Sequence, residues 1–307
     1  MANYNLLKDA TVRLVYGTQI YILEVYPDLS FSQTFTDKST PSRTLQDNDS
    51  YFEKASIHTA NPANFEFKIP VFKEPDLEVV HDRLIDCDSF DLYISTKQDV
   101  FKLEKCVFTN GTYGIERSTP LTLTVSGEAS KLSIVGTTDT YTVPGAVQNS
   151  TQNREYLMSE QLHITLDGVD ISSEVFSTTL ELQNDVKWNN NKTIAGGIEA
   201  KNAGSNVGAI YPEKYSVKKK VLSGSIGRYL CDTNQGLVNN FQVSSDLVLS
   251  AGKPTHPWST NLFGVKVDAK CSLTNRSGVA EVFTQNYDWR SIDNTTALAQ
   301  QLTYNHN

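Results

Sequence analysis

The sequence predicts a mainly β protein made of two tandem β-sandwich domains, each with a short helix and a long loop. Three observations predict this architecture: a motif that occurs twice, segments with alternating apolar and polar residues, and a long polar excursion in each half. Residues 105–112 read Lys-Cys-Val-Phe-Thr-Asn-Gly-Thr and residues 270–277 read Lys-Cys-Ser-Leu-Thr-Asn-Arg-Ser, with an offset of 271 − 106 = 165 residues. A repeat at a fixed offset indicates the structural unit, so we infer that one β unit is duplicated.

Two weaker repeats occur in the same order. Residues 14–17 resemble residues 165–168, and a helix-like stretch that begins at Asp76 has a counterpart that begins at Asn234. We therefore predict a first domain over residues 1–136, a linker over residues 137–157 and a second domain over residues 158–307. The predicted linker is rich in Thr, Ser and Asn and contains a Pro-Gly turn.

Alternating segments predict the strands of both halves. In residues 121–126, apolar Leu and Val alternate with Thr and Ser, which is typical of a sheet with one buried face and one wet face. The same reasoning predicts four strands in each half, over residues 65–71, 90–94, 100–104 and 121–126, and over residues 162–166, 222–226, 247–249 and 265–268.

Helix signals are few. Residues 75–84 have Pro near the start, acidic residues in the first turn, and Leu77, Val80 and Leu84 at helical spacing. The counterpart over residues 234–241 is weaker because Gly236 lowers helix propensity. A third short helix is predicted over residues 296–302.

Each half contains a long polar excursion, over about residues 33–63 and 183–214. Loops of this length in compact domains are usually functional or disordered. Both excursions carry large apolar side chains that a simple tether does not need. We predict that these side chains contact neighbouring subunits, the alternative being that the loops fold back on their own domain: Tyr51, Phe52, Trp188, Ile194 and Ile198.

Composition indicates a globular protein. The 307 residues are 39% hydrophobic and 20% charged, and no apolar run approaches the roughly 20 residues that span a bilayer. The start lacks a basic end followed by an apolar stretch, so we expect no secretory signal and assembly in a cytoplasm. Cys87, Cys106, Cys231 and Cys271 lack zinc-site or disulfide spacing, and we expect Cys106 and Cys271 to be buried in equivalent strands.

The sequence predicts neither an enzyme nor a protein with a cofactor or metal. It contains no HExxH, no phosphate-binding glycine loop, and no Gly-x-Ser-x-Gly at a strand-to-helix turn. The net charge is −8, which argues against a protein that grips nucleic acid. An acidic wall that repels DNA would suit a conduit that must not hold its cargo.

The order of these features resembles the tube domain of phage tail tube proteins. In the second half, residues 161–171 (Gln-Leu-His-Ile-Thr-Leu-Asp-Gly-Val-Asp-Ile) open the unit and residues 179–185 (Thr-Leu-Glu-Leu-Gln-Asn-Asp) lead into the loop. Residues 222–227 resemble the strand after that loop. The whole chain resembles the variant with two tube domains that occurs in some long, non-contractile tails. The first half departs most, because residues 21–26 are more apolar than residues 172–176.

This resemblance implies a structural virion protein whose rings stack into a tube. Six domains form a ring in the family, so three two-domain chains give a trimeric ring with pseudo-sixfold symmetry. The implied partners are further copies of the chain, tape-measure and tail-tip proteins, and double-stranded DNA that passes through without specific binding. No membrane binding by this chain is expected.

Two other interpretations stay open. One is a tail hub, tube initiator or completion protein of the same machine. The other is a carbohydrate-binding adhesive β-sandwich module, in which Trp188, Trp258 and Trp289 would stack on sugars.

Overall fold

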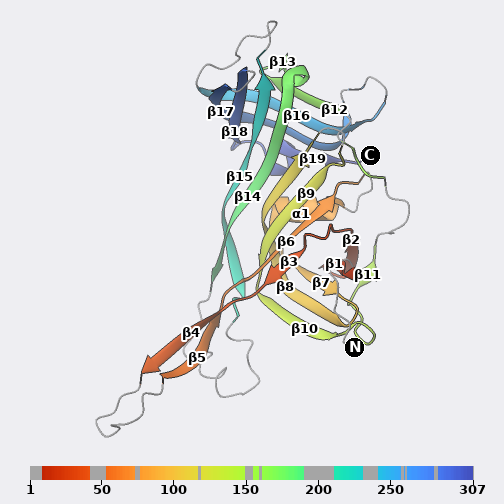
Figure 1. Cartoon of the computed structure of the whole chain (residues 1–307), viewed down its shortest axis with the longest axis vertical. Coiled ribbons are helices and arrows are strands. Elements are labelled where there is room, and N and C mark those ends of the chain that lie inside the picture. Colours follow the sequence, from red (N-terminus) through yellow and green to blue (C-terminus); the bar gives the residue numbers. More distant parts are fainter. Residues whose placement is uncertain are drawn as a thin grey trace.

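The computed structural model describes residues 9–41, 53–72, 77–116, 119–148, 155–158, 161–189, 211–230, 241–256, 259, 261–279 and 283–306. The chain is mainly β, as predicted (Figure 1). The first half contains β1 (Thr11–Tyr16), β2 (Gln19–Leu23), β3 (Ser30–Ser32), β4 (Phe35–Pro41), β5 (Glu53–Ala60), β6 (Ala63–Pro70), α1 (Glu78–Asp86), β7 (Phe90–Ser95), β8 (Asp99–Ile115), β9 (Thr122–Ala129), β10 (Lys131–Thr137) and β11 (Ala146–Val147). The second half contains β12 (Gln161–Leu166), β13 (Val169–Asp170), the 3-10 turn η3 (Ser172–Glu174), β14 (Val175–Asn189), β15 (Lys214–Tyr229), β16 (Phe241–Pro254), β17 (Leu262–Val279), β18 (Phe283–Ser291), α3 (Leu298–Gln301) and β19 (Leu302–Asn305).

The two halves have the same pattern of strand pairing. In the first half β2 pairs with β1, β1 with β7, β7 with β8, β8 with β9 and β10, β9 with β6, and β6 with β3. The second half repeats these pairs as β13–β12, β12–β16, β16–β17, β17–β18, β17–β19, β18–β15 and β15–β14. The repeated sequence motif therefore has a counterpart in repeated topology. The domain limits at residues 136 and 158 stay a prediction.

The strands β8 and β17 each cross from one layer of the sandwich to the other. The first part of β8 pairs with β7 and β10, and its second part pairs with β9. Cys106 and Cys271 lie at the change of partner in β8 and β17, and both are fully buried, which confirms their predicted equivalence. Lys105 has a positive φ of 54°, consistent with a local bend in β8.

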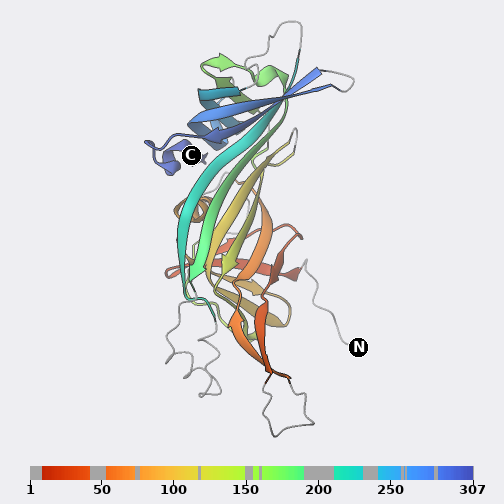
Figure 2. The ribbon, with the colours of Figure 1, turned by 90° about the vertical axis from the view of Figure 1, so that its left-hand side faces the viewer.

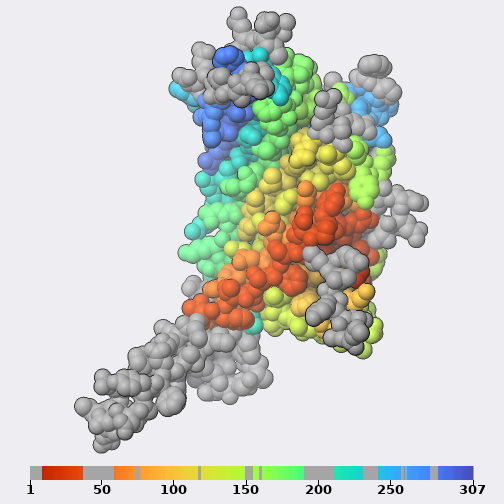
Figure 3. Space-filling model, in the orientation of Figure 1, coloured from red at the N-terminus to blue at the C-terminus, as the bar shows by residue number. Residues whose placement is uncertain are grey.

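The second parts of β8 and β17 belong to a sheet that runs through both halves, which we call the long sheet. Its order is β3, β6, β9, β8, β14, β15, β18 and β17, and the pair β8–β14 joins the halves. Figure 2 shows β15, β14, β8, β9 and β6 side by side as one curved layer. The surface shows the sequence as bands from red and orange through yellow to green (Figure 3).

The core lies between this layer and the outer strands and helices. Leu77, Val80 and Leu84 of the predicted helix are buried as the helical spacing required. A Cβ atom at Gly111 would lie 2.2 Å from Leu84 Cδ2, so glycine lets α1 approach β8. The helix ends at Cys87, whose φ is 62°.

One cross-strand pair in the long sheet exchanges its residues between the halves. In the first half Phe65 on β6 lies opposite Gly127 on β9, and in the second half Gly224 on β15 lies opposite Trp289 on β18. The aromatic ring covers the glycine in each case, since an added Cβ would lie 2.3 Å from Phe65 Cζ or 2.8 Å from Trp289 Cζ2. Each pair thus combines one aromatic residue with one glycine, but the aromatic residue lies on β6 in the first half and on β18, the counterpart of β9, in the second half.

The polar excursions differ from the predicted loops because their described parts are long hairpins. β4 pairs with β5, and β14 pairs with β15 over most of its length. Strand segments that project beyond the sandwich have no core to face, so they lack the alternation that identifies strands. Both hairpins point toward the same end of the molecule (Figures 1 and 2).

Part of the predicted linker lies against the first half. The ring of Tyr141 stacks on Tyr93 with centroids 6.2 Å apart, β11 pairs with β2, and Leu157 is fully buried. The predicted helix over residues 234–241 lies outside the described residues, apart from Phe241, which begins β16. Among the described residues, no helix has the length and apolar character needed to cross a bilayer.

Candidate functional site

One face of the long sheet is polar across its whole width. On β9, Thr122, Thr124 and Ser126 alternate with the fully buried Leu123 and Val125. β14 and β18 alternate in the same way. We call this surface the polar face and define it by Ser30, Ser32, Asn64, Glu66, Lys68, Thr112, Thr122, Thr124, Ser126, Glu128, Thr179, Glu181, Gln183, Ser223, Ser225, Ser272, Thr274, Arg276, Asn286, Asp288 and Arg290.

Strand register aligns these side chains in rows that run across both halves. Charged residues in the rows are interspersed with small hydroxyl residues, and Arg276 forms an ion pair with Asp288. A polyanion would therefore find few unpaired cations on the described part of this face. One row is Lys68, Thr124, Thr112, Glu181, Ser223, Arg290 and Ser272, and the next is Thr122, Gly114, Thr179, Ser225, Asp288 and Thr274.

Hydroxyl groups in the second half bond to the sheet itself. The Oγ atoms of Thr179 and Ser225 are 2.8 Å apart, and Thr179 Oγ1 accepts the backbone N–H of Ser225 at 3.0 Å. Thr178 donates to the Ser225 carbonyl at 3.1 Å from the other side of the strand. These bonds leave fewer free donors to hold a phosphate.

The joint between the halves is an antiparallel strand pair. β8 and β14 pair from Asn110–Gln183 to Ile115–Thr178, with Glu181 opposite Thr112 and Leu180 opposite Tyr113. Because this joint continues the ladder, the polar face crosses it without a gap.

The β14–β15 hairpin also clamps the end of α1. The last carbonyl groups of a helix have no partner within the helix. Asn184 Nδ2 donates to the Leu84 carbonyl at 2.8 Å, Lys220 Nζ donates to the Ile85 carbonyl, and Tyr215 Oη donates to the Cys87 carbonyl at 2.8 Å. The Lys220 cation also lies at the negative end of the helix dipole.

The residues directly before β15 also contact the first half. Tyr211 is 8% exposed and lies edge-on to Phe35, with ring centroids 6.2 Å apart. Lys131 Nζ lies 5.5 Å from the Tyr211 ring centroid, and Ser130 donates to the Pro212 carbonyl. One half therefore reaches over its neighbour along a continuous line of contacts.

Two edges of the long sheet have no described strand partner. On β3, Ser30–Ser32 pairs with β6 on one side only. On β17, the pairing with β16 stops at Thr274, so residues 275–279 pair with β18 alone. We call these the β3 edge and the β17 edge. The described β4–β5 hairpin forms a separate two-stranded sheet (Figure 1).

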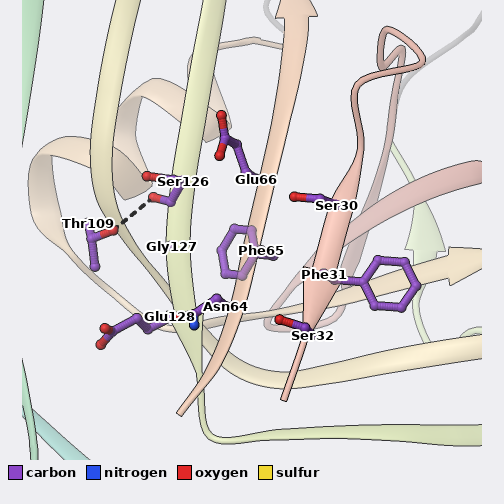
Figure 4. A pocket seen from close by; sticks show the side chains of 10 residues that line it. All are labelled: Ser30, Phe31, Ser32, Asn64, Phe65, Glu66, Thr109, Ser126, Gly127 and Glu128. Atoms are coloured by element: carbon purple, nitrogen blue, oxygen red, sulfur yellow. Dashed lines mark hydrogen bonds between the residues drawn. The ribbon is translucent and has the colours of Figure 1, made fainter. Parts of the chain in front are cut away.

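A hollow of about 360 Å³ lies beside the β3 edge. Ser30, Ser32, Asn64, Glu66 and Glu128 line it, and Figure 4 shows them on β3, β6 and β9. Phe31 points away from Ser30 and Ser32 in this view. Its ring centroid lies 5.2 Å from that of Phe101. The small serines leave space above the edge strand, and Glu66 is exposed.

The buried titratable groups belong to the core. Burial raises the pKa of the Cys271 thiol to about 12 and also raises the pKa of Cys106. Burial lowers the pKa of His81 to about 4, and its Nδ1 lies 2.6 Å from the Tyr113 hydroxyl. Thiols in this state are poor nucleophiles.

Of the residues predicted to contact neighbouring subunits, only Trp188 is described, and its contact stays a prediction. Its ring lies 5.3 Å from that of Tyr215. Tyr51, Phe52, Ile194 and Ile198 lie outside the described residues.

Of the tryptophans considered for sugar stacking, Trp289 is buried and Trp258 is not described. Trp289 is 2% exposed, so it presents no face to a sugar, and Trp258 lies outside the described residues. The described residues contain no group of three or more His, Cys, Asp or Glu that could hold a metal.

The two edges and the hollow were not predicted from the sequence. Both depend on which strands lie side by side, and the repeat does not specify that order. The only signal was indirect: Ser30 and Ser32 are small residues on either side of Phe31.

Comparison with known proteins gives one family. The model of the Bacteriophage Baseplate Tube Protein Family matches residues 77–306, which is about three quarters of the chain. No curated protein matches.

Proposed function

Because this chain belongs to the bacteriophage baseplate tube protein family, we propose that it is a ring-forming subunit of the tube through which phage DNA leaves the particle. The family is one of phage tail-associated structural proteins, and the chain is a component of the virion tail. The family fits a structural role rather than an enzymatic one.

The observation that supports the ring is that the chain joins two like units once and leaves the same joint open at both ends. Inside the chain, β8 of the first unit pairs with β14 of the second. The counterpart of β8 is β17 and the counterpart of β14 is β3 with β4, and among the described strands both β17 and β3 have an unpaired edge. A second copy repeats the joint by pairing its β3 with β17 of the first.

The projecting hairpin supports the same arrangement. β14–β15 clamps α1 of the preceding unit, whereas its counterpart β4–β5 pairs only with itself among the described elements. In the ring, β4–β5 lies over the second half of the adjacent copy. This is a head-to-tail interface, and such interfaces form rings when the rotation closes.

Three chains give the ring that we propose. Each chain contributes two units of four strands to the long sheet, so three copies contribute six units with pseudo-sixfold symmetry. Closure removes the free edges, as in any barrel. The polar face then lines the bore, and double-stranded DNA passes it without specific binding because few unpaired cations meet the phosphates.

The remaining parts of the proposal concern assembly. Rings stack through the ends of the long hairpins, and the bore houses a tape-measure protein before DNA enters. Tail-tip proteins cap the tube, and assembly takes place in the host cytoplasm. A hub or tube-initiating role is the second candidate, favoured because the family is one of baseplate tube proteins.

Electron microscopy of the purified protein tests the ring. We expect particles with a central hole and threefold symmetry, and native mass spectrometry should give multiples of three chains. Replacing residues 36–59 with an Asn-Gly turn is the matched variant, because the Asn61 N–H bonds the Thr34 carbonyl at 2.9 Å and closes the hairpin base. This variant should fold and stay monomeric.

Wild-type protein that stays monomeric across protein and salt concentrations would contradict the ring. The number of copies per virion separates the two candidate roles. A stacked tube contains many rings, whereas a hub or initiator contains one or a few.

A further inference from the structure

We propose that copies of this chain join in one specific register, in which Arg276 on the β17 edge enters the acidic hollow beside the β3 edge of the next copy. This inference rests on the proposed ring, and it names the contact that orders the copies. It is obtained by transferring the β8–β14 joint, residue by residue, to the open edges.

The first step matches β8 with β17 through their buried partners on β9 and β18. Phe108 lies opposite Gly127, as Leu273 lies opposite Trp289. After a bulge at residue 109 in β8, Gly111 lies opposite Val125, and in the unbulged β17 Asn275 lies opposite Tyr287. Gly111 therefore corresponds to Asn275.

The bulge makes the structural match differ from the sequence repeat. By the match through buried partners, Thr112 corresponds to Arg276. The repeat in the sequence would align Asn110 with Asn275, which is one residue out of step after the bulge. A slip of one residue turns every side chain to the opposite face, so the two alignments predict different contacts.

The second step matches β3 with β14. Phe31 lies opposite Phe65, and Leu180 lies opposite Gly224. Phe65 and Gly224 correspond because they pair with Gly127 and Trp289, the positions matched above. Ser32 therefore corresponds to Glu181.

The transfer then gives the register between copies. In the chain, Glu181 lies opposite Thr112. Between copies, the corresponding residues are Ser32 and Arg276, and both lie on the polar face. The neighbouring positions follow as Phe31 opposite Ser277 and Gln33 opposite Asn275.

The charges at this register are complementary. The Arg276 side chain is 78% exposed, and Ser32 is too small to block it. Glu66 lies on the next strand, so its Cα is about 12 Å from that of Arg276, from two strand spacings and one two-residue step. Extended Arg and Glu side chains span this distance together. Asp288 and Glu66 lie in opposite directions along the strands from Arg276, so the Arg276 guanidinium exchanges Asp288 of its own chain for Glu66 of the next copy when the copies join.

The joint within the chain lacks this charge pair. The residue that corresponds to Arg276 is Thr112, and the residue that corresponds to Glu66 is Ser225, both of which are neutral. The covalent link already orders the halves, so that joint needs no charge to select its partner. The joint between copies forms by encounter, where charge complementarity sets partner and register.

Charge reversal tests the pair. Arg276→Glu and Glu66→Arg should each lower ring yield at least about tenfold, since like charges that face each other are costly. The double variant should restore much of that yield. Arg290→Glu is the control, because Arg290 lies on β18 of the same face but away from either edge, and its ring yield should equal that of the wild type. Glu66→Arg leaves the Arg276–Asp288 pair intact, so it separates assembly from folding of β17.

Disulfide cross-linking tests the register. Ser32→Cys combined with Arg276→Cys should give covalent dimers and trimers under oxidation. Ser32→Cys combined with Ser277→Cys is the control, because only a one-residue slip brings that pair together.

The outcomes separate the two proposals. Rings whose yield ignores both charge reversals, or whose cysteines link only at the slipped pair, overturn the register and leave the ring standing. Wild-type protein that forms no ring under any condition overturns both.

Discussion

Asn184→Leu should loosen helix α1 from the second half of the chain while keeping a side chain with the same branching. Asn184 is 5% exposed, and its amide donates to the carbonyls of Leu84 at 2.8 Å and Phe108 at 3.2 Å. Leucine fills the same space without a donor. The substitution therefore isolates the hydrogen bonds from the packing.

The expected cost follows from these contacts. Each lost hydrogen bond contributes about 1 kcal/mol, and each buried carbonyl left without a donor adds about 1 kcal/mol or more. Asn184 Oδ1 accepts no hydrogen bond from the described residues, so removing it returns part of the loss. We expect the free energy of unfolding to fall by about 2–3 kcal/mol, and Tm to fall by about 5 °C.

Urea denaturation at low protein concentration measures the free energy, and hydrogen exchange of the α1 amides gives a local readout. Gln183→Leu is the matched control, because Gln183 is the adjacent exposed residue on the same strand. We expect that control to change stability by less than about 0.5 kcal/mol. Equal effects of the two variants, with unchanged exchange in α1, would refute the clamp.

Three further predictions concern the core. The pKa of His81 in the folded chain is about 4, below the value of 6.5 of an unperturbed histidine, so the unfolded chain binds more protons between these two pH values. The free energy of unfolding should therefore fall by about 3 kcal/mol as the pH drops from 6.5 to 4. His81→Asn should flatten this part of the pH profile, measured as the midpoint of urea denaturation. Gly127→Ala should cost about 1–3 kcal/mol by calorimetry, because its Cβ would lie 2.3 Å from Phe65 Cζ and 2.4 Å from the Val107 carbonyl oxygen, and a neutral result would show that the strands can separate. Cys106 and Cys271 should resist iodoacetamide at pH 8 in peptide mass mapping until urea unfolds the chain, and rapid labelling of the native protein would contradict their burial.

Local patterns predicted much of the fold. The alternation in residues 121–126 correctly indicated β9, and the spacing of Leu77, Val80 and Leu84 correctly indicated α1. These signals are reliable because one face of each element is buried in the core. The same reasoning predicted β8 and β17 too short, since both strands change layer and their buried face changes with it.

The candidate site was less predictable because it depends on contacts between distant segments. The polar alternation of Thr122, Thr124 and Ser126 predicted a wet face, but not that it continues across the β8–β14 joint. The repeat aligned Asn110 with Asn275, and the bulge at residue 109 breaks that alignment where the edges begin. No sequence pattern predicts that β8 has a bulge and that β17 has none.

The two strands that change layer have a mechanical consequence. β8 is hydrogen-bonded to β7 and β10 at one end and to β9 at the other, and β17 repeats the arrangement. A sandwich whose layers meet only through loops deforms by sliding one layer over the other. Here that shear would have to bend a continuous backbone at Cys106 and Cys271, both of which are fully buried in close-packed surroundings. Each unit therefore resists sliding of its two layers when a force acts along the strands.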